Sequence, residues 1–70
     1  MSVLSIRSME RLLKKAGCKR ISVEAAEKLR EILEKQGISI GKMSWKLAKH
    51  AKRRTVMQED VKLASQAKQN

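Results

Sequence analysis

The chain has 70 residues, with 17 lysines and arginines against 7 acidic residues and a formal net charge of +10 at neutral pH. A chain this short buries only about 60% of the surface that its unfolded form exposes, so it normally needs a disulfide, a metal ion or a partner chain. Cys18 and His50, the single cysteine and the single histidine, cannot form an internal disulfide or complete the tetrahedral ligand set of a structural zinc site. We therefore expect no metal and no cofactor, and we expect the chain to oligomerise.

The charge predicts a polyanionic partner, with nucleic acid favoured over an anionic membrane. No stretch approaches the ~20 apolar residues that cross a bilayer, the start of the chain does not resemble a secretory signal, and the lone cysteine favours a reducing compartment. We expect a cytoplasmic protein associated with the nucleoid or chromosome, and no membrane partner. The chain lacks Phe and Tyr, which argues against proteins that stack single-stranded bases on aromatic side chains. Because it also lacks a catalytic triad and a glycine-rich phosphate loop, we expect no enzyme.

The composition predicts an all-α fold, because there is no proline, glycine is rare, and Ala, Leu, Lys, Glu and Arg dominate. The first helix is expected over about residues 6–16, where apolar residues recur at helical spacing. Gly17 follows directly and predicts the end of that helix, since glycine adopts the left-handed conformation of a helix cap.

A long helix is predicted over about residues 22–50, with Ser22 as its N-cap. Its apolar stripe advances in steps of three and four residues and consists of Ala25, Leu29, Leu33, Gln36, Ile40, Met43 and Leu47. The helix would be roughly 43 Å long, which is too long for the rest of the chain to cover, so a partner must cover it. Gly37 and Gly41 allow two interpretations. The helix breaks there to give four helices, or it continues and its small residues let two long helices approach closely; we favour the second.

A third helix is predicted over about residues 57–67, with Thr55 as its N-cap in a Thr55–Gln58 capping box. The expected order is short helix, loop, long helix, loop and short helix, within one domain over residues 1–70.

Two basic stretches without acidic residues coincide with the two predicted loops. The first contains Arg11, Lys14, Lys15, Lys19 and Arg20, and the second contains Lys42, Lys46, Lys49, Lys52, Arg53 and Arg54. A helix begins after each loop, at Ser22 and at Thr55, and the free N–H groups of a helix N-terminus bind phosphate readily. The two loops are therefore the predicted contacts with a polyanion.

The chain resembles the archaeal-type histones from about Ser5 to Leu63. The resemblance depends on five segments in this order: LLKKAG ending at Gly17, KRIS at 19–22, ILEKQG ending at Gly37, KLAKHAKRRT at 46–55 and QEDVKLA at 58–64. It implies a histone fold that forms an obligate head-to-tail dimer, with an identical or a related chain, and that compacts double-stranded DNA with little sequence preference.

The resemblance also implies roles for individual residues. Arginines 11 and 20 would face DNA, with one near the minor groove. Together with the basic loops, this gives a predicted DNA-binding set of Arg11, Lys14, Lys15, Lys19, Arg20, Ser22, Lys52, Arg54 and Thr55. Arg53 would form a structural salt bridge with Asp60. Leu47, His50 and Asp60 would lie where two dimers meet, giving tetramers or longer assemblies on DNA.

Several residues depart from the family pattern. Lys52 replaces the usual glycine, which predicts a less tightly turned second loop, and Lys15 and Lys19 stand where acidic residues are common. Glu27 and Gln36 replace apolar residues. Trp45 is expected to pack in the core or half-buried, in preference to a role in binding DNA. Two other functions stay open: a histone-fold protein that binds other proteins rather than DNA, and a basic amphipathic peptide that acts on membranes.

Overall fold

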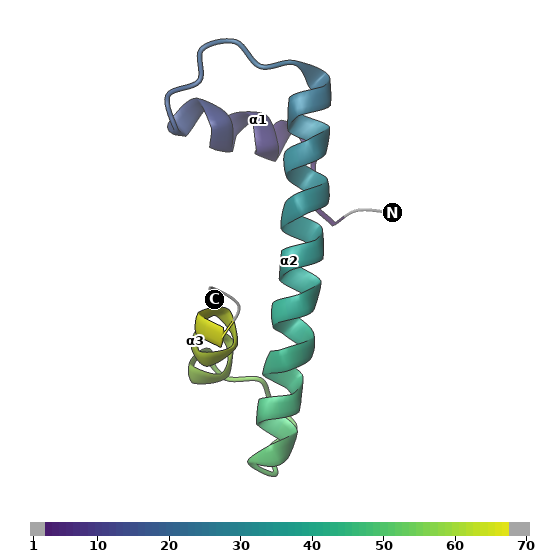
Figure 1. Ribbon diagram of the computed structural model, residues 1–70, viewed down its shortest axis with the longest axis vertical. Helices are drawn as coiled ribbons and strands as arrows, with labels where there is room; N and C mark the ends of the chain where they lie inside the picture. The colour runs from purple at the N-terminus through teal and green to yellow at the C-terminus, as the bar shows by residue number, and fades with distance from the viewer. Residues whose placement is uncertain (1–2, 68–70) are drawn as a thin grey trace. The chain divides into compact units, whose positions relative to one another are not determined.

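The computed structural model describes residues 3–67 and contains three α-helices and no strand in that part of the chain (Figure 1). Helix α1 spans Ile6–Lys15, α2 spans Val23–His50 and α3 spans Gln58–Ala67. The predicted all-α class and the short–long–short order are confirmed. None of these helices is long and apolar enough to cross a membrane. The chain divides into two compact units, residues 1–35 and 36–70, and α2 contributes to both.

In the first unit, local hydrogen bonds define both ends of α1. The Ser5 hydroxyl accepts a hydrogen bond from the Ser8 N–H at 3.0 Å, which makes Ser5 the N-cap. At the other end Gly17 has a φ of +105°, and its N–H donates to the Lys14 carbonyl at 3.0 Å. The Cys18 N–H donates to the Leu13 carbonyl at 3.0 Å. These two bonds form a Schellman motif, so the predicted stop at Gly17 is confirmed.

Helix α2 begins directly after Ser22, whose hydroxyl accepts from the Ala25 N–H at 3.1 Å, as predicted for an N-cap. The helix continues for 28 residues through Gly37 and Gly41 without a break. The four-helix interpretation is therefore wrong. Apart from the neighbouring residues and the backbone of α2 itself, a Cβ atom added at either glycine would meet no atom within 4 Å, so no other part of the chain packs against these two glycines.

The end of α2 repeats the motif that ends α1, although no glycine is available. Lys52 has a φ of +61°; its N–H donates to the Lys49 carbonyl at 2.8 Å, and the Arg53 N–H donates to the Ala48 carbonyl at 2.9 Å. The expectation of a less tightly turned second loop is wrong, because Lys52 adopts the left-handed conformation that glycine would otherwise supply. This conformation costs about 1–2 kcal/mol for a residue that has a Cβ atom.

The start of α3 differs from the prediction. The Met57 carbonyl accepts the first helical hydrogen bond, from the Val61 N–H at 3.3 Å, so the N-cap position is Met57 and not Thr55. The Asp60 carboxylate accepts from the Met57 N–H at 2.8 Å. An acid three residues into a helix can bond back to the N-cap N–H in this way, which is half of a capping box. The capping box predicted over 55–58 is therefore wrong by two residues.

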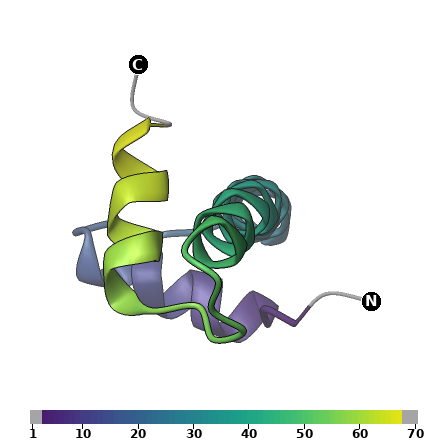
Figure 2. The ribbon, with the colours of Figure 1, turned by 90° about the horizontal axis from the view of Figure 1, so that it is seen from below.

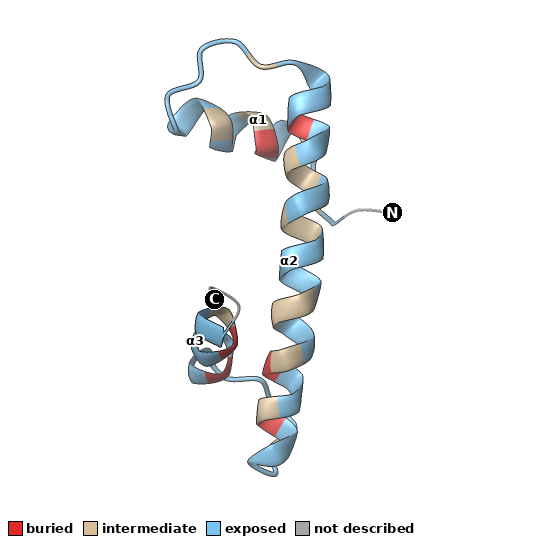
Figure 3. Ribbon diagram, viewed as in Figure 1, coloured by how far each residue is buried: buried red, intermediate tan, exposed pale blue. Residues whose placement is uncertain are grey.

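Few side chains are fully buried in the described residues (Figure 3). The first unit buries Met9 and Ala26; the second, in which α3 lies beside the C-terminal half of α2 (Figure 2), buries Ser44, Ala48, Asp60 and Ala64. Most of the predicted α2 stripe is only half-buried, at Leu29, Leu33, Ile40, Met43 and Leu47, while Ala25 and Gln36 are exposed. The chain therefore does not cover its own apolar stripe, as the sequence predicted.

Candidate nucleic-acid interface

The second loop, residues 51–57, is fixed by a buried carboxylate. Arg53 binds Asp60 through two hydrogen bonds, Nη1 to Oδ2 at 2.8 Å and Nη2 to Oδ1 at 2.9 Å. The same Nη1 atom donates to the Thr55 carbonyl at 3.1 Å. Because Asp60 also accepts from the Met57 N–H, one carboxylate joins the start of the loop to the start of α3. The structural ion pair implied by the resemblance is thus present.

The electrostatics of this pair favour its charged form. The hydrogen bond from Arg53, followed by the one from the Met57 N–H, lowers the pKa of Asp60 from 3.8 to about 2, against the opposing effect of burial. The hydrogen bond to Asp60 in turn raises the pKa of Arg53. The charge of Asp60 is therefore neutralised by a cation that is fixed in place, and the remaining loop cations are not needed for that purpose.

The polar residues predicted to contact DNA from this loop point outward. Lys52, Arg54 and Thr55 are exposed, and in the described part of the chain their side chains form no hydrogen bond or ion pair. They leave two positive charges and a hydroxyl available just before the start of α3. An anion can approach them without breaking a contact of the fold.

The first loop has a similar character. Its predicted cations are exposed and likewise form no ion pair among residues 3–67: Arg11, Lys14, Lys15, Lys19 and Arg20. Ser22 uses its hydroxyl to cap α2, so its contribution to an anion site would be the backbone N–H groups of the helix start rather than the hydroxyl. The two loops belong to different compact units, and each forms a basic surface by itself.

The residues predicted for dimer–dimer contact are in three different environments. Leu47 is half-buried, His50 is exposed, and Asp60 is buried and bonded to Arg53. Leu47 and His50 are three residues apart and lie on one face of α2. Asp60 makes three hydrogen bonds, two through Oδ2 and one through Oδ1, so one of its approximately four acceptor positions stays open, on Oδ1.

Three features were not predicted from the sequence. Trp45 is 41% exposed and so lies outside the core, with more than half of its surface covered, and the Lys49 ammonium lies 5.3 Å from the centre of its ring. Ser44 is buried and donates from its hydroxyl to the Ile40 carbonyl at 2.7 Å. The N-cap at Ser5 could have been found, because a serine directly before an apolar helical pattern is its usual signal. No cluster of His, Cys, Asp and Glu in the described ranges could hold a metal ion.

This helix order, with its basic loops and its incompletely covered long helix, defines a histone-fold protein. Residues 3–64 match the model of the family described as histone-like transcription factor (CBF/NF-Y) and archaeal histone, and the chain belongs to that family. It is 46% identical over 67 residues to one of the subunits of the archaeal histone HAN1 from Thermococcus zilligii, and the match covers 96% of this chain and 100% of that protein. It is 47% identical over 64 residues to probable archaeal histone 3 of Methanocaldococcus jannaschii, covering 91% of this chain and 96% of that protein. The family recognised in the sequence is confirmed.

Proposed function

We propose that this protein is a chromosomal histone that binds and compacts double-stranded DNA as a head-to-tail dimer in the cytoplasm. The observation that carries the proposal is the second loop. There Arg53 neutralises Asp60 and fixes the backbone, while Lys52, Arg54 and Thr55 stay exposed and unpaired. A loop fixed in this way holds its cations in register with a phosphate backbone at little cost in conformational entropy. The role is structural and involves no cofactor and no catalysis.

The half-covered stripe of α2 supports the dimer. Ile40, Met43 and Leu47 are only partly buried, although they face the same side of a 28-residue helix. The stripe of a second, antiparallel α2 would cover them, with the identical chain or a related histone as the partner. The open surfaces of Gly37 and Gly41 would allow close approach of the two helices.

We further propose that dimers associate through Leu47, His50 and Asp60. The open acceptor position on Asp60 allows a histidine of another dimer to donate to it without displacing Arg53. The two implied roles of Asp60, bracing the loop and joining dimers, are therefore compatible. Such contacts would extend the assembly along DNA.

The test is the salt dependence of binding to a duplex of about 60 base pairs. Each neutralised phosphate contributes a slope of about −0.9 in log affinity against log salt. Replacing Arg11, Arg20 and Arg54 by glutamine removes up to six contacts per dimer, so the slope should become shallower by several units and the affinity should fall by several orders of magnitude at low salt.

The matched control replaces three exposed lysines away from the two loops, Lys28, Lys35 and Lys62, and removes the same charge. We expect its salt slope to stay close to that of the wild type. If both triple variants bind DNA like the wild type, the chain is instead a histone-fold protein that binds other proteins. If liposomes bind more tightly than the duplex, the membrane-active alternative holds.

A further inference from the structure

The C-terminal half of α2 carries three lysines that neither loop uses. From Gln36 to His50 the helix has no acidic residue, and within residues 3–67 Lys42, Lys46 and Lys49 form no ion pair. The N-terminal half of the same helix differs, because its lysines are neutralised by a glutamate.

In that N-terminal half, Lys28 and Lys35 lie 3.6 Å and 3.4 Å from the Glu31 carboxylate. The two ammonium groups, Lys28 first, lower the pKa of Glu31. These exposed i, i+3 and i, i+4 pairs are the usual way in which a helix surface balances its charge. The C-terminal half of α2 differs from this half, because its three lysines have no acidic residue to balance their charge.

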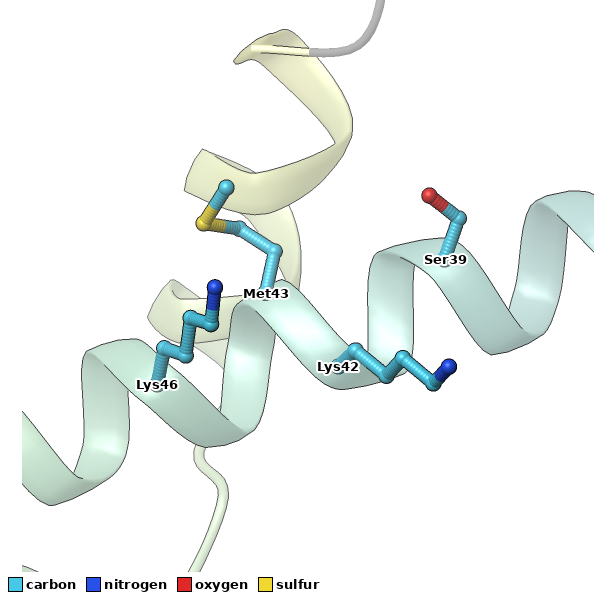
Figure 4. Close-up of a pocket in the computed structure, with 4 residues that line it drawn as sticks. All are labelled: Ser39, Lys42, Met43 and Lys46. Carbon is cyan, nitrogen blue, oxygen red and sulfur yellow. The ribbon is translucent and has the colours of Figure 1, made fainter.

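Lys42 and Lys46 line a shallow hollow of ≈ 200 Å³ on the surface of α2, together with Ser39 and Met43 (Figure 4). The Lys46 side chain rises beside Met43, whereas the Lys42 side chain extends along the helix toward the end that carries Ser39 (Figure 4). The two ammonium groups thus occupy separate positions along the helix and do not converge on one point, which suits an extended polyanion better than a single small anion. We call Ser39, Lys42 and Lys46 the α2 lysine face.

This face lies on the side of α2 opposite to the packed side. Lys46 is two residues from both Ser44 and Ala48, which are buried, and two residues of an α-helix correspond to a turn of about 200°. The second loop leads from the end of α2 to α3, which belongs to the packed side. A duplex held at that loop and a duplex held at the α2 lysine face would therefore lie on different sides of α2.

We propose that the α2 lysine face binds the phosphate backbone of a second DNA duplex, so that the protein bridges two duplexes. This inference rests on the proposed binding of a first duplex at the loops. The chemistry is that of lysine acting as a mobile point charge for phosphate. Trp45, the largest apolar group nearby, has the Lys49 ammonium over its ring, so the cationic surface continues across it. An acidic protein would need an apolar anchor there, and one face of the Trp45 ring already carries the Lys49 ammonium.

The experiment measures bridging, as the amount of labelled duplex that the protein retains on beads carrying a second duplex. The variant K42Q/K46Q is compared with K28Q/K35Q, which removes the same charge from the same helix. Both variants should bind a single short duplex equally, and K42Q/K46Q alone should lose bridging by roughly tenfold. Equal bridging by the two variants would overturn the inference, and so would an equal loss of bridging and of single-duplex binding in K42Q/K46Q.

Trp45, the only tryptophan, gives an independent signal next to this face. Its emission should change in a second phase of a duplex titration, after the loops are saturated, and this phase should be absent in K42Q/K46Q. If that variant keeps the second phase but loses binding to polyglutamate, the face binds acidic protein and the inference is wrong. Failure of the proposed function is a separate result, because it would appear as unchanged single-duplex binding in the triple arginine variant.

Discussion

Lys52 occupies a backbone conformation that its side chain disfavours, since its φ is +61°. Replacing it by glycine keeps the Schellman hydrogen bonds and removes the steric cost of Cβ, so we expect the free energy of unfolding to rise by about 1 kcal/mol. Denaturation in urea measures this change. Lys52→Ala is the control, because it removes the same charge but keeps Cβ and should not stabilise the protein. Equal stability of the glycine and alanine variants would contradict the explanation.

The Arg53–Asp60 pair predicts a dependence of stability on pH. The pKa of Asp60 falls from 3.8 to about 2 on folding, so the unfolded chain binds the proton more tightly than the folded chain. The stabilisation is complete above about pH 4 and is lost as the pH falls toward 2. The melting temperatures of the wild type and of Asp60→Asn, measured between pH 6 and pH 2, should converge as the pH falls from 4 toward 2.

The diagnostic quantity is the difference in stability between the two proteins, because that difference isolates the contribution of Asp60. Asp60→Asn cannot form the charge-assisted pair and should be less stable at neutral pH. A difference that stays constant down to pH 2 would show that the ion pair contributes nothing through its charge. Arg53→Lys keeps a cation but cannot make two parallel hydrogen bonds, so its stability at neutral pH should lie between those of the wild type and Asp60→Asn.

At the scale of the helices, the helix ends that depend on a single local residue were predictable from the sequence. The ends that depend on hydrogen bonds to residues outside the helix, or on the turn's own backbone, were not. Gly17 and Ser22 marked the helix ends correctly, because glycine and serine act there through their own local chemistry. Thr55 was misleading, since the cap of α3 depends on Asp60, whose position is set by a contact with Arg53 outside the helix. Lys52 was misread because its left-handed conformation follows from the hydrogen bonds of the turn and not from its propensity. For the candidate site, the charge pattern alone predicted the two basic loops. It did not show which of their cations would form a structural ion pair; only the family resemblance indicated Arg53.

The stripe of α2 can be tested with two isoleucines of the same helix. Ile40 is half-buried on the stripe, whereas Ile38, 60% exposed, is two residues away on the opposite side. If a partner covers the stripe, Ile40→Ala should cost about 2–4 kcal/mol and Ile38→Ala less than about 0.5 kcal/mol. Urea unfolding at fixed protein concentration measures both. Similar small costs at the two positions would mean that nothing covers the stripe.

For the whole molecule, the accessible surface supports the same conclusion. The chain alone exposes 6140 Å², whereas a folded monomer of 8.0 kDa typically exposes about 4,400 Å². Within residues 3–67, ten large apolar side chains are exposed, among them Leu12, Ile32 and Leu63. A difference of roughly 1,700 Å² per chain is within the range that obligate dimers bury. This surface is consistent with the dimer proposed above, in which a partner would supply the missing cover.

Charge and oligomerisation together predict opposite effects of salt on the free protein and on its complex with DNA. A dimer carries twice the formal charge of +10, and this charge repels itself when the chains pack together. Raising the salt concentration screens the repulsion and should raise the melting temperature of the free protein, while it weakens DNA binding by counterion exchange. Tenfold dilution at constant salt should lower the melting temperature, since unfolding and dissociation are coupled. Circular dichroism across a grid of salt and protein concentrations measures both dependences, and sedimentation at each dilution gives the mass. A melting temperature independent of protein concentration, with a sedimenting mass of one chain, would contradict the dimer and leave the α2 stripe without the cover on which the proposed function depends.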